Sequence, residues 1–404
     1  MSEKVFITGQ GIISAIGDNT QQVLNSILTQ KSGIGFSQYV NTMYQHEIPV
    51  AEVRYSNEEL LSQIPAKNQH FFRTRNSLLA YVAVKEALES AHIQNTKDLR
   101  TGLISSTSVG GMDKTEIFFK DYLKNPSAGR MKNVAGHDCG DSAHILANHF
   151  GITHFVTTIS TACSSSANAI MLGARLIKQN MLDRVIVGGV DSLTKFTING
   201  FNTLMILDRE ACRPFDDTRS GLNIGEGAAY LVLESEKILQ KFPKKVLGMV
   251  SGYGNACDAF HQTASSPEGT GPRLAMEKAL SSAKLNPSQI SYVNVHGTGT
   301  PNNDLSEGKA MEILFEGKVP PFSSTKSFTG HTLGAAGSIE AVVSLLSIEH
   351  QFIPPNLNFK YKIQDLTISP ESQLIRNVEI NHILSNSFGF GGNNTSLVFS
   401  KSTE

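Results

Sequence analysis

Segments with the character of strands alternate with segments of helical periodicity along this chain, which restricts it to the α/β class. Lys4–Thr8 is expected to form a strand that ends in a glycine turn, and Arg184–Val190 is expected to form a buried strand. Arg75–Ala91 and Gly334–His350 have the length and spacing of helices.

The chain also divides into two parts that begin alike. KVFITGQGI at residues 4–12 resembles KVLGMVSGYG at residues 245–254, although a likeness this short does not establish a duplication. A charged segment that contains Pro243 precedes the second run. We therefore expect an N-terminal half of residues 1–245 and a C-terminal half of residues 246–404, since a chain of this length rarely has a single core.

The charge balance and the cysteines exclude several classes of function. Lys and Arg total 35 and Asp and Glu total 36, so the net charge of −1 argues against nucleic-acid or membrane-surface partners. The four cysteines contain no CxxC pair, which argues against a zinc site or a disulfide framework and favours a reducing compartment. We expect no signal peptide, because the first residues contain no long apolar stretch, and no run approaches the roughly 18 apolar residues that a membrane span needs. We expect a cytoplasmic protein with no metal site and no membrane span.

Cys163 lies where strand character changes to helical character. Phe155–Ser160 is rich in β-branched residues and is expected to form a short buried strand, and helical spacing begins at Ser164. Unpaired N–H groups and the dipole at a helix N-terminus favour negative charge, so we expect a lowered thiol pKa and a reactive thiolate. The alternative is a small buried cysteine without a chemical role, because free cysteine is among the most buried residue types.

A histidine in the second half also follows a strand. His296 comes directly after the predicted strand Ser291–Val295, and a side chain at such a strand end can point into a cleft. Asp304 and Glu307 fit a capping box for the next helix at least as well as they fit a catalytic role.

A second histidine, His331, lies just before the helix predicted at Gly334–His350. Glu340 has small and apolar neighbours inside that helix, and a carboxylate in such surroundings needs a partner. Lys326 is the nearest candidate in the sequence. A single histidine before a helix is usually structural, but two loop histidines together with Cys163 favour chemistry.

A glycine-rich turn near the C-terminus could supply backbone donors. Gly389, Gly391 and Gly392 would let the chain approach a bound group closely, and the N–H groups of such a turn can form an oxyanion hole. Phe388 and Phe390 would either gate a channel or pack against their surroundings.

One cysteine with two histidines suggests a particular reaction. A thiol hydrolase needs one histidine as base and a side chain that orients it. Two neutral imidazoles can instead both donate N–H hydrogen bonds to one carbonyl oxygen and stabilise an enolate. A thioester that loses its carboxylate as CO2 would become a carbon nucleophile and attack an acyl group on the cysteine, which is decarboxylative Claisen condensation.

Four motifs carry these residues: TACSSS at 161–166, HGTGTP at 296–301, SSTKSFTGH at 323–331 and SFGFGGNN at 387–394. They resemble motifs of the β-ketoacyl-acyl carrier protein synthases, condensing enzyme II type, of the thiolase superfamily. RPFDDTRSGLNIGEGA at 213–228 and DAFH at 258–261 also match, so the resemblance is colinear over nearly the whole chain. It implies the thiolase fold: two similar halves in a five-layer αβαβα sandwich, usually dimeric.

By this resemblance Cys163 would accept the acyl chain, and His296 and His331 would assist decarboxylation of malonyl-acyl carrier protein. No dissociable cofactor is implied, because the carrier protein supplies its own phosphopantetheine arm. The other implied site residues are Lys326, Glu340, Glu307 and Asp304 around the histidines; the Cys163 and Phe390 N–H groups with Gly389, Gly391 and Phe388 at the oxyanion hole and gate; and Phe201, Thr298, Thr300 and Ser265 along the substrate path.

The sequence departs from the family pattern in two places. GHDCGDSAH at residues 136–144 is polar where relatives are often apolar near the dimer interface, which puts a saturated long-chain substrate in doubt. Met205 stands where relatives often carry an arginine that contacts the carrier protein. The basic residues that could replace it are Arg209, Lys67, Arg73 and Arg75.

PNNDLSEG at residues 301–308, together with the polar HDCGDS at residues 137–142, resembles ketosynthases of aryl-polyene and flexirubin-type pathways, which commonly pair with a chain-length-factor subunit that lacks the cysteine. The partner would then be a related chain instead of a second copy. Alternative functions are an initiating synthase, a thiolase, or a non-catalytic subunit that determines chain length. The paired histidines argue against the first two, and the intact Cys163 argues against the third.

Overall fold

The computed structural model describes residues 3–402, and within these residues ten strands form one continuous sheet while two others form a short ladder. The strands of the first half are β1 (Val5–Ser14), β2 (Thr101–Ser106), β3 (Phe155–Ile159), β4 (Arg184–Asp191) and β5 (Gly227–Ser235). Those of the second half are β6 (Gly248–Cys257), β7 (Tyr292–Asn294), β8 (Phe322–Ser323), β11 (His382–Gly389) and β12 (Asn393–Ser400), and the separate ladder pairs β9 (Phe352–Ile353) with β10 (Ile375–Arg376).

The helices fall between these strands as the alternating pattern predicts. They are α1 (Thr20–Leu28), α2 (Asn57–Ser62), α3 (Arg75–Ser90), α4 (Met112–Lys124), α5 (Asp141–Phe150), α6 (Ser165–Lys178), α7 (Lys195–Thr203), α8 (Glu236–Lys241), α9 (Thr270–Ala283), α10 (Pro301–Leu314), α11 (Lys326–Thr329) and α12 (Ala336–His350). Short 3₁₀ turns are η1 (Ala66–Phe71), η2 (Met131–Asn133), η3 (Pro287–Gln289), η4 (Leu333–Ala335) and η5 (Phe390–Gly392).

The two halves have the same topology. The sheet runs β3-β2-β4-β5-β1 in the first half and β8-β7-β11-β12-β6 in the second, which is the same order when each half is numbered separately. Strand directions agree as well: β2 is parallel to β3 and β4, as β7 is to β8 and β11, while β5 and β12 are antiparallel to their neighbours. The two units join where β1 pairs with β6. The division at residue 245 stays a prediction.

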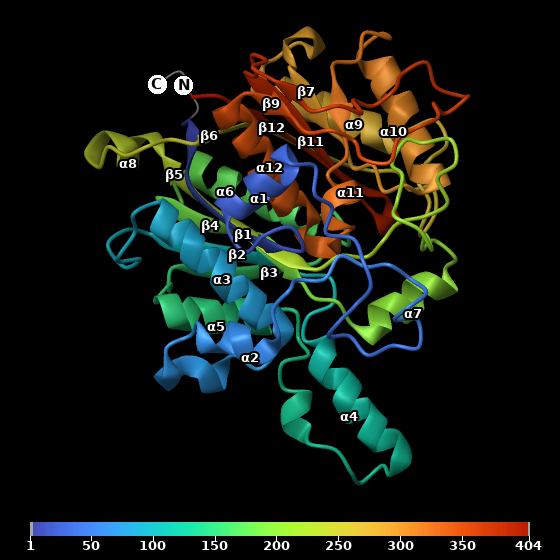
Figure 1. Cartoon of the computed structure of the whole chain (residues 1–404). Helices are drawn as coiled ribbons and strands as arrows, with labels where there is room; N and C mark the ends of the chain where they lie inside the picture. The colour runs from blue at the N-terminus through green and yellow to red at the C-terminus, as the bar shows by residue number, and fades with distance from the viewer. Residues whose placement is uncertain (1–2, 403–404) are drawn as a thin grey trace.

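Five layers result, as the fold-class prediction stated. Helices α6 and α12 lie between the two sheet halves, with α3 and α5 outside the first half and α9 and α10 outside the second (Figure 1). Every residue of α12 from Ala336 to Ile348 is buried, which explains its nearly continuous run of small and apolar residues. This central layer holds the main hydrophobic core.

Two sequence expectations about strands were wrong in detail. The first strand continues to Ser14 instead of turning at its glycines, because Gly9 and Gly11 lie against α3, where a Cβ would come within 2.3 Å of Ala87 O and 2.1 Å of Ala83 O. β3 was expected to be buried but is half-buried, because it is the terminal strand of the sheet and pairs with β2 along one edge only.

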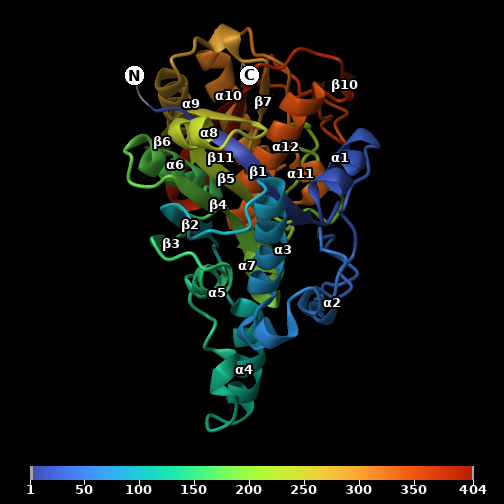
Figure 2. The same cartoon turned by 90° about the vertical axis from the view of Figure 1, so that its left-hand side faces the viewer.

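Helix α4 projects from the body of the molecule, as both side views show (Figures 1 and 2). Among residues 3–402, no helix has both the length and the apolar character required to cross a bilayer.

Candidate active site

Cys163 lies in the turn between β3 and α6, where the sequence placed it. Ala162 has a positive φ of 52°, and Ser164 is the N-cap residue of α6. The turn is fastened by side-chain hydrogen bonds: Thr161 N donates to Ser165 Oγ at 2.8 Å, and Ser164 Oγ donates to Thr161 O at 2.8 Å. The cysteine is therefore held rigidly at the start of a buried helix and is only 5% exposed.

The expected lowering of the Cys163 pKa was wrong. Burial raises the pKa of this thiol to about 11, although the Lys326 ammonium and a hydrogen bond from the Phe390 N–H both act in the opposite direction. The resting side chain is therefore a thiol at neutral pH. Its proton must leave when an acyl thioester forms.

His296 follows β7 and is held at both its backbone and its ring. The N–H groups of His296 and Gly297 donate to the Glu307 carboxylate at 2.8 and 2.9 Å. Lys326 Nζ lies 3.3 Å from His296 Nδ1. An ammonium can only donate, so Nδ1 accepts and the ring proton of neutral His296 is on Nε2.

His331 lies in the loop between α11 and η4 and has the same tautomer for a different reason. Its N–H donates to Asn223 O at 2.7 Å, and its Nδ1 accepts a hydrogen bond from the Leu333 N–H at 3.1 Å. The proton of the neutral ring is therefore again on Nε2.

These three side chains converge. Cys163 Sγ and one ring nitrogen from each of His296 and His331 all lie within 4.8 Å of one another, and the two rings meet edge to face with centroids 5.3 Å apart. Burial, reinforced by the Lys326 charge, holds the pKa of both histidines well below the ordinary value. The site therefore presents two neutral N–H donors beside a sulfur, and the nearby ammonium disfavours a metal cation among them.

Lys326 and Glu340 form the buried pair that sequence spacing suggested. Lys326 Nζ donates to Glu340 Oε1 at 2.5 Å and to His296 O at 2.6 Å, and Ser387 Oγ donates to Glu340 Oε2 at 3.3 Å. Burial raises the pKa of Glu340, and the Lys326 charge opposes that shift. The pair places one positive charge directly behind His296.

The predicted capping box of Asp304 and Glu307 is absent, because α10 begins earlier, at Pro301, with Thr300 as its N-cap. Asp304 instead accepts hydrogen bonds from Phe215 N at 2.8 Å and Gly299 N at 3.2 Å. Glu307 accepts three N–H groups, and burial still raises its pKa to about 7. Both carboxylates hold the loop that carries His296 instead of capping the helix.

The turn η5 brings the Phe390 N–H against Cys163. Gly389 is required there, because a Cβ would lie 2.9 Å from Thr161 O and 3.3 Å from Cys163 N. Phe390 stacks on Phe201 of α7, with ring centroids 5.9 Å apart and planes 19° apart. Phe388 is buried in β11 with its ring 5.9 Å from that of His296, so it packs against the site wall. Gly391 has φ of 79° and completes the turn.

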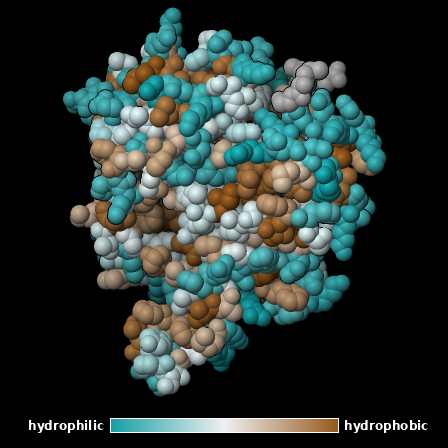
Figure 3. All heavy atoms as spheres, turned by 180° about the vertical axis from the view of Figure 1, so that it is seen from behind, coloured by the Kyte–Doolittle hydropathy of each residue, from teal (hydrophilic) through white to brown (hydrophobic). Residues whose placement is uncertain are grey.

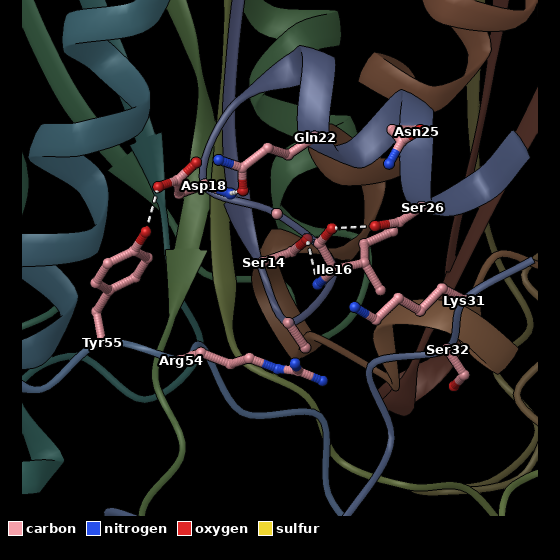
Figure 4. A pocket seen from close by; sticks show the side chains of 12 residues that line it. Ser14, Ile16, Asp18, Gln22, Asn25, Ser26, Lys31, Ser32, Arg54 and Tyr55 are labelled. Atoms are coloured by element: carbon pink, nitrogen blue, oxygen red, sulfur yellow. Dashed lines mark hydrogen bonds between the residues drawn. The ribbon is translucent and has the colours of Figure 1, made fainter. Parts of the chain in front are cut away.

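A cavity of about 290 Å³ opens onto Cys163, His296 and His331. All four residues expected along the substrate path line it, namely Phe201, Thr298, Thr300 and Ser265. Sequence reasoning missed the apolar wall made by Leu204, Ile206 and Leu222, which carries no signal beyond hydrophobicity, and the amides Asn302 and Asn303. A polar hollow beside α1, lined by Lys31, Arg54 and Tyr55 among others, contains none of these residues (Figure 4).

The residues proposed for carrier docking do not share one environment. Arg75 is buried, and its guanidinium makes a bidentate pair with Glu226 at 2.6 and 2.8 Å, so it cannot meet a partner. Lys67 and Arg73 are exposed, and Arg209 is exposed but paired with Glu47 at 2.8 Å. Met205 is 87% exposed.

Comparison with known proteins identifies the family. Residues 2–238 match the N-terminal domain and residues 247–360 the C-terminal domain of beta-ketoacyl synthase. The chain belongs to the β-ketoacyl synthase family. It is 33% identical to 3-oxoacyl-[acyl-carrier-protein] synthase 2 of Staphylococcus aureus (strain COL) and 31% identical to that of Vibrio harveyi, with 99% of each chain covered in both comparisons. Members of this family are acyltransferases that form carbon–carbon bonds.

Solved structures of the family superpose closely. The ishigamide ketosynthase/chain length factor has a TM-score of 0.92 at 27% identity and covers 100% of both chains. A ketosynthase in complex with its chain length factor from Xenorhabdus doucetiae has a TM-score of 0.88 at 31% identity, covering 99% of this chain and 98% of that one. The thiolase fold expected from the sequence motifs is thereby confirmed.

Proposed function

We propose that this chain is a 3-oxoacyl-[acyl-carrier-protein] synthase that elongates an acyl chain by decarboxylative Claisen condensation. The observation that carries the proposal is the convergence of Cys163 Sγ with two buried, neutral histidines that carry their ring protons on Nε2 and line the same cavity. The 31–33% identity to named synthases over the full chain supports it.

The reaction begins with transfer of an acyl group to Cys163. The thiol sulfur attacks the acyl-carrier thioester, its proton passes to the departing carrier thiolate, and an acyl-Cys163 thioester remains. The tetrahedral oxyanion formed on the way is held by the backbone N–H groups of Cys163 and Phe390. The cavity residues Thr298, Thr300 and Ser265 contact the phosphopantetheine arm, which belongs to the carrier protein, and no dissociable cofactor takes part.

Condensation then uses the two histidines. The malonyl thioester loses its carboxylate as CO2, and the N–H groups of His296 and His331 hold the enolate oxygen that forms. The enolate carbon attacks the acyl-Cys163 carbonyl, and collapse of the tetrahedral intermediate expels the Cys163 thiolate, which takes up a proton. The product is a 3-oxoacyl thioester on the carrier.

The test separates the sulfur from the histidines. Cys163→Ala should abolish condensation, whereas Cys163→Gln should still release CO2 from malonyl-carrier protein. Incubation of the native enzyme with acyl-carrier protein should give a mass adduct on the peptide that contains Cys163. Absence of the adduct with every chain length tried would refute the proposal and favour a non-catalytic chain-length subunit.

We also propose that the functional unit is a dimer, formed by the edge of β3 and the arm of α4. Among residues 3–402, β3 pairs only through β2, so its other edge is free to extend the sheet. Apolar side chains gather on the arm (lower left in Figure 3), and a hollow of about 1200 Å³ lies between α4 and α7. Its exposed apolar residues include Ile117, Phe119, Leu123 and Phe196.

The partner across this interface is either a second copy or a related chain-length-factor subunit. His137, Asp138 and His144 are exposed beside β3, so the interface is polar next to the strand. Purification of the untagged native complex decides between the two partners. A second, homologous chain would place the enzyme in a polyene or pigment pathway, and a homodimer would place it in fatty-acid elongation. The carrier-protein substrate and four free cysteines support a cytoplasmic location.

A further inference from the structure

A cluster of side-chain amides lies directly behind the turn that carries Phe390. Asn393 is the first residue after this turn, and its Oδ1 accepts three hydrogen bonds. The donors are Asn168 Nδ2 at 3.0 Å, Asn255 Nδ2 at 2.8 Å and Ser164 Oγ at 2.9 Å, whose single proton is shared with Thr161 O. Two of these donors belong to the start of α6 and the third to β6, so one carbonyl oxygen joins three segments.

The orientation of this amide is fixed by its surroundings. Thr395 Oγ1 donates to Asn168 Oδ1 at 2.8 Å and accepts from Asn255 Nδ2 at 2.8 Å. Asn168 Nδ2 also donates to Thr161 Oγ1 at 2.9 Å. Both neighbouring asparagines therefore direct their Nδ2 groups toward Asn393, so the Asn393 side chain must present its carbonyl oxygen as the acceptor. Since Asn168 and Thr395 are buried, a lost bond here would not be replaced freely by water.

The backbone of the turn has little stiffness of its own. Gly391 and Gly392 both have positive φ, at 79° and 77°, and glycine can leave such conformations easily. The two residues that flank the turn, Gly389 and Asn393, pair with each other as the last pair of the β11–β12 ladder. The Asn393 side chain thus fastens the base of the turn to Ser164, the residue that follows the nucleophile.

We infer that Asn393 is a positioning residue that holds the Phe390 N–H against Cys163 by fastening the turn 390–392 to the first turn of α6. The inference rests on the proposed function, because the Phe390 N–H acts there as an oxyanion donor. Acyl transfer to Cys163 and condensation both need this donor. Decarboxylation needs His296 and His331, which have no hydrogen bond to Asn393 within the described residues.

The two half-reactions should therefore separate when the fastening is removed. Asn393→Leu keeps a similar volume without an acceptor, and Asn393→Asp keeps an oxygen for all three donors. Thr395→Val is the matched control, since it removes a hydroxyl from the same cluster but none of the three donors to Asn393, and Asn168 Nδ2 is still oriented by its bond to Thr161 Oγ1. Acyl transfer is followed by mass spectrometry in a single turnover with acyl-carrier protein, and CO2 release is followed in the Cys163→Gln background.

Removal of a whole oxyanion donor lowers rates by about 10²–10³-fold, so displacement of one should slow acyl transfer by about 10- to 100-fold in Asn393→Leu. CO2 release in that variant should stay within about twofold of its parent, and Asn393→Asp and Thr395→Val should transfer acyl groups at nearly the native rate. Native transfer rates in Asn393→Leu would overturn the inference. Equal slowing of both half-reactions, or equal slowing by Thr395→Val, would show a merely structural role and overturn it as well.

Amide hydrogen exchange of a peptide spanning residues 388–393 tests the fastening without any substrate. Exchange should be faster by about tenfold in Asn393→Leu and unchanged in Asn393→Asp and Thr395→Val. Unchanged exchange in Asn393→Leu would overturn the inference even if the native enzyme accepted no acyl group. That last result would instead refute the proposed function, so the two failures are distinguishable.

Discussion

Replacement of Lys326 by methionine tests the electrostatic arrangement behind the histidines. Lys326 Nζ donates to His296 O at 2.6 Å and to Glu340, and it lies 3.3 Å from His296 Nδ1. Methionine is of similar length and carries no charge, so Glu340 is left buried with only the Ser387 hydroxyl. Breaking a buried pair in this way costs about 3–5 kcal/mol of unfolding free energy.

The double variant Lys326→Met, Glu340→Gln separates stability from chemistry. It contains no unpaired buried charge, so it should recover most of the lost unfolding free energy. It does not restore the donor to His296 Nδ1. His296 is then free to carry its proton on Nδ1 and to turn a lone pair toward the enolate oxygen. Loss of one such donor should slow CO2 release by about 10²–10³-fold, or about 2.7–4 kcal/mol.

The assay combines urea unfolding with CO2 release from malonyl-carrier protein in the Cys163→Gln background. Near-native unfolding free energy together with slow CO2 release is the expected result for the double variant. Rapid CO2 release from a stable double variant would refute the argument that Lys326 fixes the tautomer of His296.

Three further predictions concern the same site. In a Cys257→Ser variant, which lacks the exposed thiol, the rate of Cys163 alkylation by iodoacetamide should rise about tenfold per pH unit up to about pH 11. A rate that levels off near pH 8 would contradict the raised pKa of Cys163. Gly389→Ala should lower the free energy of unfolding by about 1–3 kcal/mol and slow acyl transfer, because the new Cβ would contact backbone atoms of Thr161 and Cys163. Native stability and a native transfer rate would contradict this, since they would show that the backbone can move to accommodate the methyl group. Because the pKa of Glu307 is raised to about 7, the unfolded chain releases this proton above about pH 4.5, whereas the folded protein releases it only near pH 7. The free energy of unfolding therefore falls as pH rises from 4.5 to 7. In Glu307→Gln this fall, measured by urea unfolding at the two pH values, should be smaller by about 3 kcal/mol.

The sequence located the reacting groups but not their environments. Cys163 could be placed because strand and helix periodicities change within a few residues of it. Its pKa could not be predicted, because burial in the folded chain raises it, and the Lys326 charge and Phe390 N–H that oppose the rise are remote from Cys163 in sequence. Likewise, Arg75 looked like a surface charge because its partner, Glu226, is 151 positions away.

Predictions from the spacing of neighbouring residues also failed where contacts with distant parts of the chain determine the role of a side chain. Asp304 and Glu307 have suitable spacing for a helix cap, but the helix begins at Pro301, so both carboxylates lie within its first turns. From there they bind backbone N–H groups of other segments. Asn393 looked like part of a glycine-rich turn, and only the folded chain shows three donors around its oxygen.

The shared topology of the two halves explains why the sulfur and the second histidine meet. Helix α6 precedes β4 in the first half as α12 precedes β11 in the second, so the two helices occupy equivalent positions in the central layer. Their first turns touch: Ser338 N donates to Ser166 Oγ at 2.9 Å, and a Cβ on Gly337 would lie 2.9 Å from Ala167 N. Cys163 stands just before one helix and His331 just before the other. The fold therefore brings two equivalent helix starts together, and the two halves differ in which chemical group each start presents.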